Sequence, residues 1–422
     1  MKIRIPRITK MAVTGALVIV FSIAGSLSQD VQAATAQDNM PLGRQAVAIS
    51  DGQYPGSYFP NTELLGPAEM RITCLGSGMP NLTRKSASLS YLVELGNGDK
   101  FLFDVGAGSM ANLWSLRPDF SKIDKVFASH LHTDHVGDFM GLHIGSWLSG
   151  RYTPIHIYGP SGSTPEMGTK AFVDGMKKGY AWDIAGRSGA LPDAGGEIVV
   201  HEFDYKAVNE VVYQENGVTI RSWPAIHLLD GPVSYSLEWQ GLKYVFGGDT
   251  YPNKWYIKHA AGADIASHEA FLPPKALAKY FGWSLGQATF VSTRIHTEPQ
   301  AFGKVMSAVK PRLAVGYHVF NDFDTKPQIM QEIRQTYDGP LALAIDYMVF
   351  NVTKDDIKVR MAVIDEAVWP QPSIYPQQAA DPSKRIGFSK EMIEGRVVFD
   401  DVIKFYYDQA NDMFGTDFAP PD

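Results

Sequence analysis

The feature that most constrains this chain is the run Ser129-His130-Leu131-His132-Thr133-Asp134-His135, which places three imidazoles and one carboxylate close together. Neutral imidazole nitrogen and carboxylate oxygen are the ligands that zinc and similar divalent metals prefer. In extended backbone, residues i and i+2 point the same way, so His130 and His132 can hold one metal ion. After the chain turns, Asp134 and His135 can reach a second ion. An apolar strand precedes the run and a turn into a helix follows it. The fold must therefore place this loop at the carboxyl end of a strand, where ligand sites collect in α/β sheets.

The N-terminus predicts export. A basic segment (residues 2–10) precedes an apolar segment (11–27), and Val31-Gln32-Ala33 fits the small-x-small cleavage pattern of a secretory signal peptide. The apolar segment is short for a membrane span and is interrupted by polar residues, so we expect no stable membrane anchor after cleavage. No twin arginine and no cysteine lie near the cleavage site. We therefore expect a bacterial, Sec-exported protein that is periplasmic or secreted.

Composition narrows the class further. The chain has 422 residues, of which 45% are hydrophobic and 20% charged, and its formal net charge is −7. Affinity for nucleic acids rests largely on phosphate contacts from Lys and Arg, so an acidic exported chain predicts no nucleic-acid partner. The single cysteine, Cys74, excludes an intramolecular disulfide and is expected as a buried thiol at the end of a strand.

Four segments are expected along the chain. The arm that follows the signal peptide is rich in Gly, Pro, Ser and Gln and has no helical period. The segments are the signal peptide (1–33), the N-terminal arm (34–69), the main domain (70–352) and a C-terminal extension (353–422) with a helix from 389 to about 413.

Polar residues follow the predicted strands throughout the main domain. Asp104 lies on a glycine turn after a strand, where its carboxylate can hold a neighbouring loop by hydrogen bonds. Further candidates at strand exits or helix starts are His227, Asp249, His268, Glu269, His296, Thr297 and His318. His143, His156, His201 and His259 lack this context and are interpreted as core or surface residues. Residues 341–352 are expected to form one strand.

These motifs resemble the metallo-β-lactamase superfamily of dinuclear metallohydrolases over residues 70 to about 352. The His-x-His-x-Asp-His run is family-specific, and Gly248-Asp249-Thr250 is similar to the motif that supplies a bridging aspartate. His268-Glu269-Ala270, His296-Thr297 and His318 follow in the order of the ribonuclease Z and arylsulfatase-like branch. Exported proteins grouped with guanitoxin-pathway metallo-hydrolases are also similar.

The resemblance implies an α/β (α+β) fold, a four-layer αββα sandwich with an N-terminal arm and a C-terminal extension. It implies two zinc ions per chain, with manganese or iron as alternatives. The implied ligands are His130, His132 and His227 for one ion and Asp134, His135 and His318 for the other, with Asp249 between them. This leaves room for a bridging hydroxide as the nucleophile. By the same resemblance, Asp134 orients the nucleophile or takes its proton, and His296 donates to the transferring group or the leaving oxygen. Four further residues are expected to hold the ligands in position without binding metal themselves: Asp104, His268, Glu269 and Thr297.

Several relatives of this branch fit the sequence poorly. The RNA-binding arm of ribonuclease Z lies between the third histidine motif and the bridging aspartate, where this chain has only residues 240–243 between two strands. True β-lactamases generally lack an aspartate of the Asp249 type. We therefore expect a hydrolase of small-molecule esters, in first place an arylsulfatase-like enzyme. A phosphodiesterase or organophosphate hydrolase and a lactonase are the alternatives, and a metal-binding module without turnover is the alternative of a different class.

The surroundings of the site stay open at the level of sequence. Four aromatic residues either line a pocket for an aryl group or belong to the core: Trp147, Trp255, Phe281 and Trp283. The C-terminal extension covers the active-site edge, covers a sheet edge, or forms a homodimer.

Overall fold

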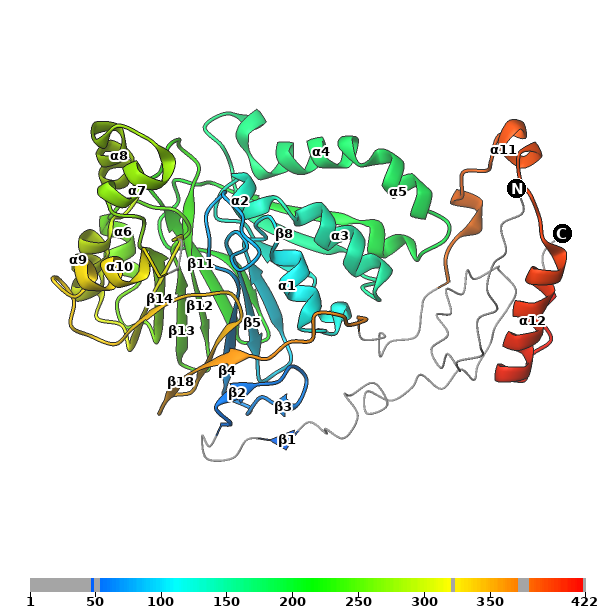
Figure 1. Ribbon diagram of the computed structural model, residues 1–422, viewed down its shortest axis with the longest axis horizontal. Helices are drawn as coiled ribbons and strands as arrows, with labels where there is room; N and C mark the ends of the chain where they lie inside the picture. The colour runs from blue at the N-terminus through cyan, green and yellow to red at the C-terminus, as the bar shows by residue number, and fades with distance from the viewer. Residues whose placement is uncertain (1–46, 49–53, 320–322, 371–378, 420–422) are drawn as a thin grey trace, which may run out of the picture.

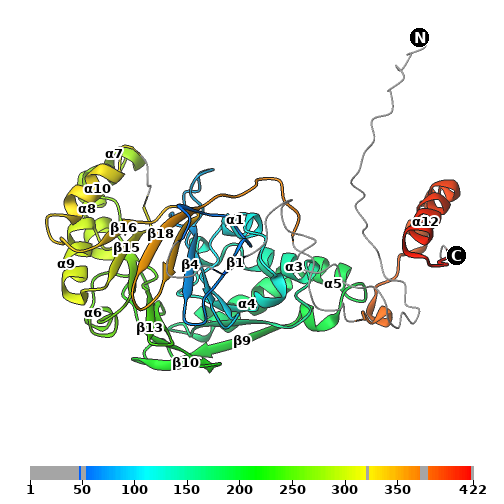
Figure 2. The ribbon, with the colours of Figure 1, turned by 90° about the horizontal axis from the view of Figure 1, so that it is seen from below.

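Figure 1 shows the computed structural model of the chain, which describes residues 47–48, 54–319, 323–370 and 379–419. Two large β-sheets face each other and helices cover their outer sides, as Figure 2 shows from below. This is the expected αββα layering. The expected signal peptide lies outside the described residues. Among the residues described, no helix is both long and apolar enough to cross a membrane.

The first sheet has nine strands and joins an antiparallel half to a parallel half. From one edge to the other its strands are β2 (Ser57–Tyr58), β18 (Ile357–Ala362), β17 (Met348–Val352), β4 (Met70–Gly76), β5 (Ser90–Leu95), β6 (Lys100–Phe103), β7 (Lys125–Phe127), β8 (Ile155–Pro160) and β9 (Ile198–Phe203). Pairing is antiparallel from β18 to β6 and parallel from β6 to β9. The strands from β6 onward therefore end at one edge.

The second sheet has seven strands and the same mixed character. In order they are β10 (Glu210–Glu215), β11 (Val218–Pro224), β12 (Val233–Trp239), β13 (Leu242–Phe246), β14 (Ile265–Glu269), β15 (Leu313–Tyr317) and β16 (Leu341–Leu343). Pairing is antiparallel from β10 to β13 and parallel from β13 to β16. Two further short strands, β1 (Val47–Ala48) and β3 (Glu63–Leu64), pair with each other.

Aromatic side chains fill the space between the sheets. Phe103, Phe127 and Tyr158 occupy matched positions on neighbouring strands, so their rings stack at centroid distances of 5.4 and 4.6 Å. Tyr235 and Tyr244 of the second sheet meet Phe103 edge-on. Such offset and edge contacts add to the stabilisation from burying the rings. The inner core thus fixes the spacing of the two sheets from which the site is built.

Helices close the two outer faces with apolar cores of their own. On the first sheet lie α1 (Ser109–Ser115), α2 (Thr133–Val136), α3 (Phe139–Leu148), α4 (Thr169–Gly179) and α5 (Ala181–Arg187), with the short 3-10 turns η1 (Phe120–Lys122), η2 (Pro165–Met167) and η3 (Asp193–Gly196). On the second lie α6 (Lys254–His259), α7 (Pro274–Phe281), α8 (Leu285–Phe290), the π-helix η4 (Val291–Ile295), α9 (Pro299–Val309) and α10 (Lys326–Ile333).

The sandwich extends beyond the expected domain limits of 70 and 352. β18 lies after the upper limit and β2 before the lower one, and both pair within the first sheet. Arg360 of β18 makes two hydrogen bonds to the carboxylate of Glu63 on β3, at 2.8 and 2.7 Å. Part of the N-terminal arm and part of the C-terminal extension are therefore built into the body.

The segment expected as one strand, 341–352, forms two strands in different sheets. β16 belongs to the second sheet and β17 to the first, and the chain crosses between them at residues 344–347. Asp346 fixes the crossing, because its carboxylate accepts hydrogen bonds from the backbone N–H groups of Ser77 and Ala87 and from the Asn112 amide. The hydrogen bonds that the Asp346 carboxylate accepts hold residues 344–347 in this crossing, although the residues on either side favour a strand.

The C-terminal extension ends in two helices instead of the one expected over 389–413. These are α11 (Lys390–Glu394) and α12 (Asp400–Phe414), preceded by the turn η5 (Pro382–Lys384). Gly395 interrupts the helical pattern. Both figures show α12 standing apart from the sandwich.

Candidate metal centre

The expected ligands come together at one edge of the sandwich. His130 and His132 follow β7 of the first sheet, and Asp134 and His135 lie in α2 directly after it. His227, Asp249 and His318 follow β11, β13 and β15 of the second sheet. β11 runs parallel to β13 and β15, so these three strands deliver their ligands to the same edge.

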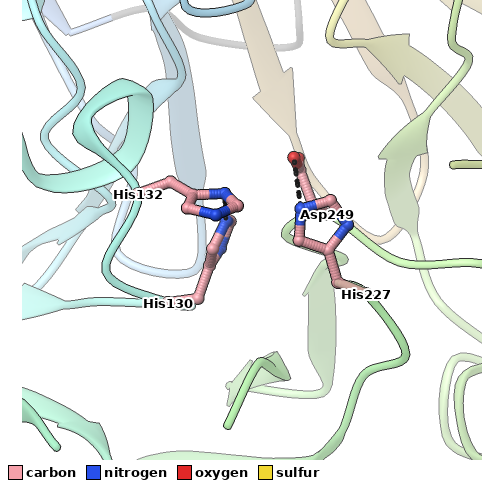
Figure 3. A group of neighbouring side chains, drawn as sticks. All are labelled: His130, His132, His227 and Asp249. Atoms are coloured by element: carbon pink, nitrogen blue, oxygen red, sulfur yellow. Dashed lines mark hydrogen bonds and ion pairs between the residues drawn. The ribbon is translucent and has the colours of Figure 1, made fainter. Parts of the chain in front are cut away.

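The first ligand group consists of His130, His132, His227 and Asp249. One potential ligand atom from each lies within 4.8 Å of all the others. Figure 3 shows His130 and His132 reaching from one side and His227 and Asp249 from the other. The Nε2 atom of His130 lies 2.9 Å from Nδ1 of His132, and Nε2 of His227 lies 3.7 Å from the Asp249 carboxylate.

The second ligand group consists of Asp134, His135, His318 and again Asp249. Nε2 of His318 lies 3.2 Å from both carboxylates, and Nε2 of His135 lies 3.2 Å from Asp249 and 3.5 Å from Asp134. All four residues are buried. Asp249 is therefore shared by the two groups.

The unpartnered atoms and the spacing both fit divalent metal ions. Nε2 of His135 and Oδ1 of Asp249 are buried without a hydrogen-bond partner. Ligand atoms about 2.1 Å from a tetrahedral zinc ion lie roughly 3.4 Å apart, close to the separations in the second group. An orphaned ring nitrogen facing an orphaned carboxylate oxygen is costly without a cation between them.

The protonation states of three ligands favour the same interpretation, whereas the carboxylates around His135 outweigh burial and raise the pKa of that ring well above its usual range. Burial lowers the pKa of His227 to about 4 and holds the pKa of His130 well below its usual range, so both rings are neutral and carry a free lone pair. Burial opposes ionisation of Asp249, but the adjacent histidines outweigh it and its pKa lies well below the usual range. Neutral imidazole and ionised carboxylate are the forms that bind metal.

Asp104 fixes the loop that carries the histidine run. Its carboxylate accepts hydrogen bonds from the backbone N–H and the hydroxyl of Ser129, each at 2.7 Å, and lies 2.6 Å from Nδ1 of His135. A carboxylate on Nδ1 presents Nε2 to a metal. Gly248 also serves this loop, because a Cβ at that position would lie 2.7 Å from the Ser129 side chain. Ser129 lies within the run itself, but its part in holding the loop depends on contacts that sequence does not show.

His296 lies beside the second group and forms, with Glu269, His318 and Asp249, a third cluster whose potential ligand atoms lie within 4.8 Å of one another. Its Nδ1 lies 2.6 Å from Oε2 of Glu269, whose other oxygen accepts a hydrogen bond from the backbone N–H of Thr250. The ring of Phe271 stacks on the His296 ring at 4.0 Å and 8°. Thr297 donates its hydroxyl to the carbonyl of Thr250 at 2.6 Å, which ties this segment to the Asp249 turn. Phe271 was not expected to have a role, and only its position directly after the His268-Glu269-Ala270 motif hints at one.

Comparison with known proteins finds one matching family, several ribonuclease Z relatives and a solved structure with a similar fold. The family described as "Anti-Pycsar protein Apyc1" matches residues 70–276. The chain is 31% identical over 205 residues to ribonuclease Z of Mycobacterium marinum, covering 47% of this chain and 70% of that protein. It is 30% identical over 203 residues to ribonuclease Z of Mycolicibacterium gilvum, covering 47% and 68%. The metallo-β-lactamase fold protein YhfI from Bacillus subtilis shares the fold, with a TM-score of 0.50 and 17% identity over 68% of this chain and 100% of that one.

The chain belongs to the metallo-β-lactamase fold metallo-hydrolase superfamily. The ribonuclease Z relatives establish the membership, and the YhfI likeness supports the fold alone. As a member of this superfamily, the chain is a metallo-hydrolase whose two ligand groups suit divalent metal.

His268, which was expected to support the ligands, lies on the face of its strand that points away from them. His268 alternates with Glu269 along β14, so its ring points to the opposite face of the sheet. There it contacts Tyr256 and Phe302 in the helix-facing core, and burial lowers its pKa to about 4. The interpretation of His268 as a support for the metal ligands is wrong, because strand alternation separates it from its neighbour.

The aromatic residues considered for the pocket pack in the apolar cores. Trp147 is fully buried and donates its indole N–H to the carbonyl of Pro192. Trp255, Phe281 and Trp283 pack against the core under the second sheet. Of the aromatic residues of this region, it is Phe271 that contacts the site, through His296 and His318.

Proposed function

We propose that this chain is an exported hydrolase of small-molecule esters of a tetrahedral acid, with a phosphodiester as the substrate best supported. The observation that carries the proposal is the pair of ligand groups that share Asp249, of which the second is fully buried. Two metals held in this way suit displacement at phosphorus, where charge develops on both the attacking and the leaving oxygen. Relatives named ribonuclease Z support the phosphodiester, because RNA is cleaved at such a bond.

In this proposal each metal has its own residues. His130, His132 and His227 would hold one ion, Asp134, His135 and His318 the other, and Asp249 both. Two divalent ions, zinc in first place, would supply activation of water and neutralisation of charge on the ester. His135 and His227 are oriented for this, since Nδ1 of each faces an acceptor, Asp104 and the Ile295 carbonyl, and Nε2 faces the site.

His296 is placed to protonate the leaving oxygen. Burial lowers the pKa of His296, and burial together with Asp249 raises the pKa of Glu269; the two side chains lie within hydrogen-bond distance, at 2.6 Å. With Nδ1 held by Glu269, the Nε2 atom is left for the substrate. The side chain is 11% exposed, which leaves an approach from solvent. A general acid in such a position contributes about 10²–10⁴ in rate.

Asp134 stays ionised beside the place where water would be activated. The histidines next to it outweigh burial and hold its pKa well below the usual range. An ionised carboxylate there can orient the attacking water by accepting a hydrogen bond from it.

The size of the substrate is inferred from the turn between β12 and β13. Trp239 pairs with Leu242 across the two-residue turn Gln240-Gly241, both of which have positive φ. The place at which the RNA-binding arm is expected is thus a tight hairpin. We infer a small-molecule substrate and no nucleic-acid partner, which agrees with the acidic composition and with the export that the sequence predicts.

An arylsulfatase-like activity is the second candidate. A sulfate monoester also presents a tetrahedral centre with developing charge. The exposed apolar residues on either side of His227 suit the aryl group of such an ester.

A panel of chromogenic esters on the zinc-loaded full chain tests the proposal. The panel holds bis(4-nitrophenyl) phosphate, 4-nitrophenyl phosphate, 4-nitrophenyl sulfate and an aryl lactone. We expect fastest hydrolysis of the phosphodiester, and loss of all activity in Asp249→Ala. Fastest hydrolysis of the sulfate would establish the second candidate. Two bound zinc ions with no turnover of any ester would overturn the proposal in favour of a metal-binding module.

A further inference from the structure

The metal-facing residue His227 lies between exposed apolar side chains. Ile226, Leu228 and Leu229 have exposed fractions of 42, 54 and 67%, whereas the His227 side chain itself is only 2% exposed. The histidine therefore points into the site while its neighbours stay at the surface. We name Ile226, Leu228 and Leu229 the apolar rim.

The loop that carries the rim, residues 225–232, is tied at both ends. The Ala225 N–H donates to the Pro232 carbonyl at 2.9 Å and closes the loop. Ile226 donates to the hydroxyl of Thr250 at 3.0 Å and accepts from the Tyr251 N–H at 2.7 Å, which fixes the loop to the Asp249 turn. The rim is therefore held beside the ligands and not left to fold inward.

The far side of the loop is also anchored. The hydroxyl of Tyr205 donates to the carboxylate of Asp230 at 3.0 Å. Directly after the loop, the Val233 N–H donates to the carbonyl of Ser129, the residue that precedes the first histidine ligand. A loop with so many polar ties could carry polar side chains at its surface without structural loss, so its leucines need another reason.

The helix that leads to Ile295 also exposes apolar side chains. Nδ1 of His227 lies 3.4 Å from the carbonyl of Ile295, so the rim loop meets η4. η4 continues α8, which exposes Leu285 by 56% and Phe290 by 60%. Single exposed apolar residues are ordinary on protein surfaces, but a group beside a polar centre is typical of a ligand site.

We propose that the apolar rim binds a hydrocarbon group of the substrate, so that the ester cleaved here is an amphiphile with an alkyl or aryl group on the His227 side of the centre. This inference rests on the proposed function, because it places the ester itself at the two ligand groups. The polar part of the substrate meets the buried ligands, and the apolar part covers side chains that otherwise face water. Each methylene that the rim removes from water stabilises the complex, by up to about fourfold in affinity per group.

A homologous series of alkyl 4-nitrophenyl phosphates, methyl to hexyl, tests this on the full zinc-loaded chain below the concentrations at which the esters form micelles. We expect kcat/KM to rise by about twofold to fourfold per methylene over the first members. In the double variant Leu228→Ser, Leu229→Ser, the ratio of hexyl to methyl kcat/KM should fall at least about tenfold. Leu64→Ser is the matched control, because Leu64 is 57% exposed on β3, away from the ligand loops, and should leave the series unchanged.

The outcomes separate the two proposals. If the methyl ester and all longer members are inert, the proposed phosphodiester activity fails. If all members react equally well, the activity stands and the apolar rim does not bind the substrate. If the double variant instead changes the elution volume of the protein while the chain-length series is unaltered, the rim is a contact between copies of the chain and the inference is overturned.

Discussion

At the scale of single residues, the metal ligands could be predicted from the sequence, whereas some of the residues that hold them in place could not. The seven expected ligands occupy positions that follow from strand ends and a contiguous motif, so the sequence was sufficient to predict their grouping. Ser129 and Phe271 act through a hydrogen bond and a ring stack that depend on the packing of distant segments. His268 shows the converse, since its motif neighbours are at the site while strand alternation turns its own ring away.

The separate position of His296 leads to a prediction about leaving groups. His296→Ala should lower kcat by about 10² or more for an ester with a poorly acidic leaving group, and less for a 4-nitrophenyl ester, because only the former depends on protonation. Metal content, measured by mass spectrometry of the purified protein, should stay at that of the wild type. Parallel loss of metal and activity would show that His296 is structural.

At the scale of elements, strands outside residues 70–352, the region that resembles the superfamily, complete the first sheet. The sequence indicated the strands of the sandwich from apolar runs and glycine turns, but the arm and the extension lack such runs. β2 is held by pairing with β18, and β18 is tied to β3 by a buried ion pair whose partners, Glu63 and Arg360, are almost 300 residues apart. A local sequence pattern carries no sign of such a contact, which is why the limits 70 and 352 were drawn too narrowly for the sheet.

The ion pair between Arg360 of β18 and Glu63 of β3 should contribute measurably to the stability of the protein. Arg360→Ala leaves the buried Glu63 carboxylate without its partner and should lower the free energy of unfolding by about 3–5 kcal/mol in urea titrations. The double variant Arg360→Met, Glu63→Leu should recover most of that loss, since no unpaired charge remains. Unchanged stability of the single variant would mean that β3 is not coupled to the sandwich.

At the scale of the whole molecule, the ligand groups join the two sheets. His130 and His132 belong to the first sheet, and His227 and Asp249 to the second. Bound metal would therefore stabilise the contact between the sheets, in addition to the apolar core between them.

Removal of metal should accordingly lower the thermal stability. An ion held at a concentration of about 1,000 Kd stabilises a fold by about 4 kcal/mol, so chelation should lower the Tm by roughly 5–10 °C, and added zinc should restore it. Asp249→Ala is the control, and its Tm should respond little to the chelator. An equal Tm for the wild type with and without chelator would contradict a metal between the sheets.

The spread of the ligands along the chain has a consequence for when activity arises. Asp134 meets His318 across 184 residues, and the first ligand group also needs residues from both sheets. Contacts of such high sequence separation form late in folding. A nascent chain that ends before residue 318 thus holds fragments of the centre but no complete one. Hydrolysis is therefore expected only after the strands that carry these ligands have taken their places in both sheets.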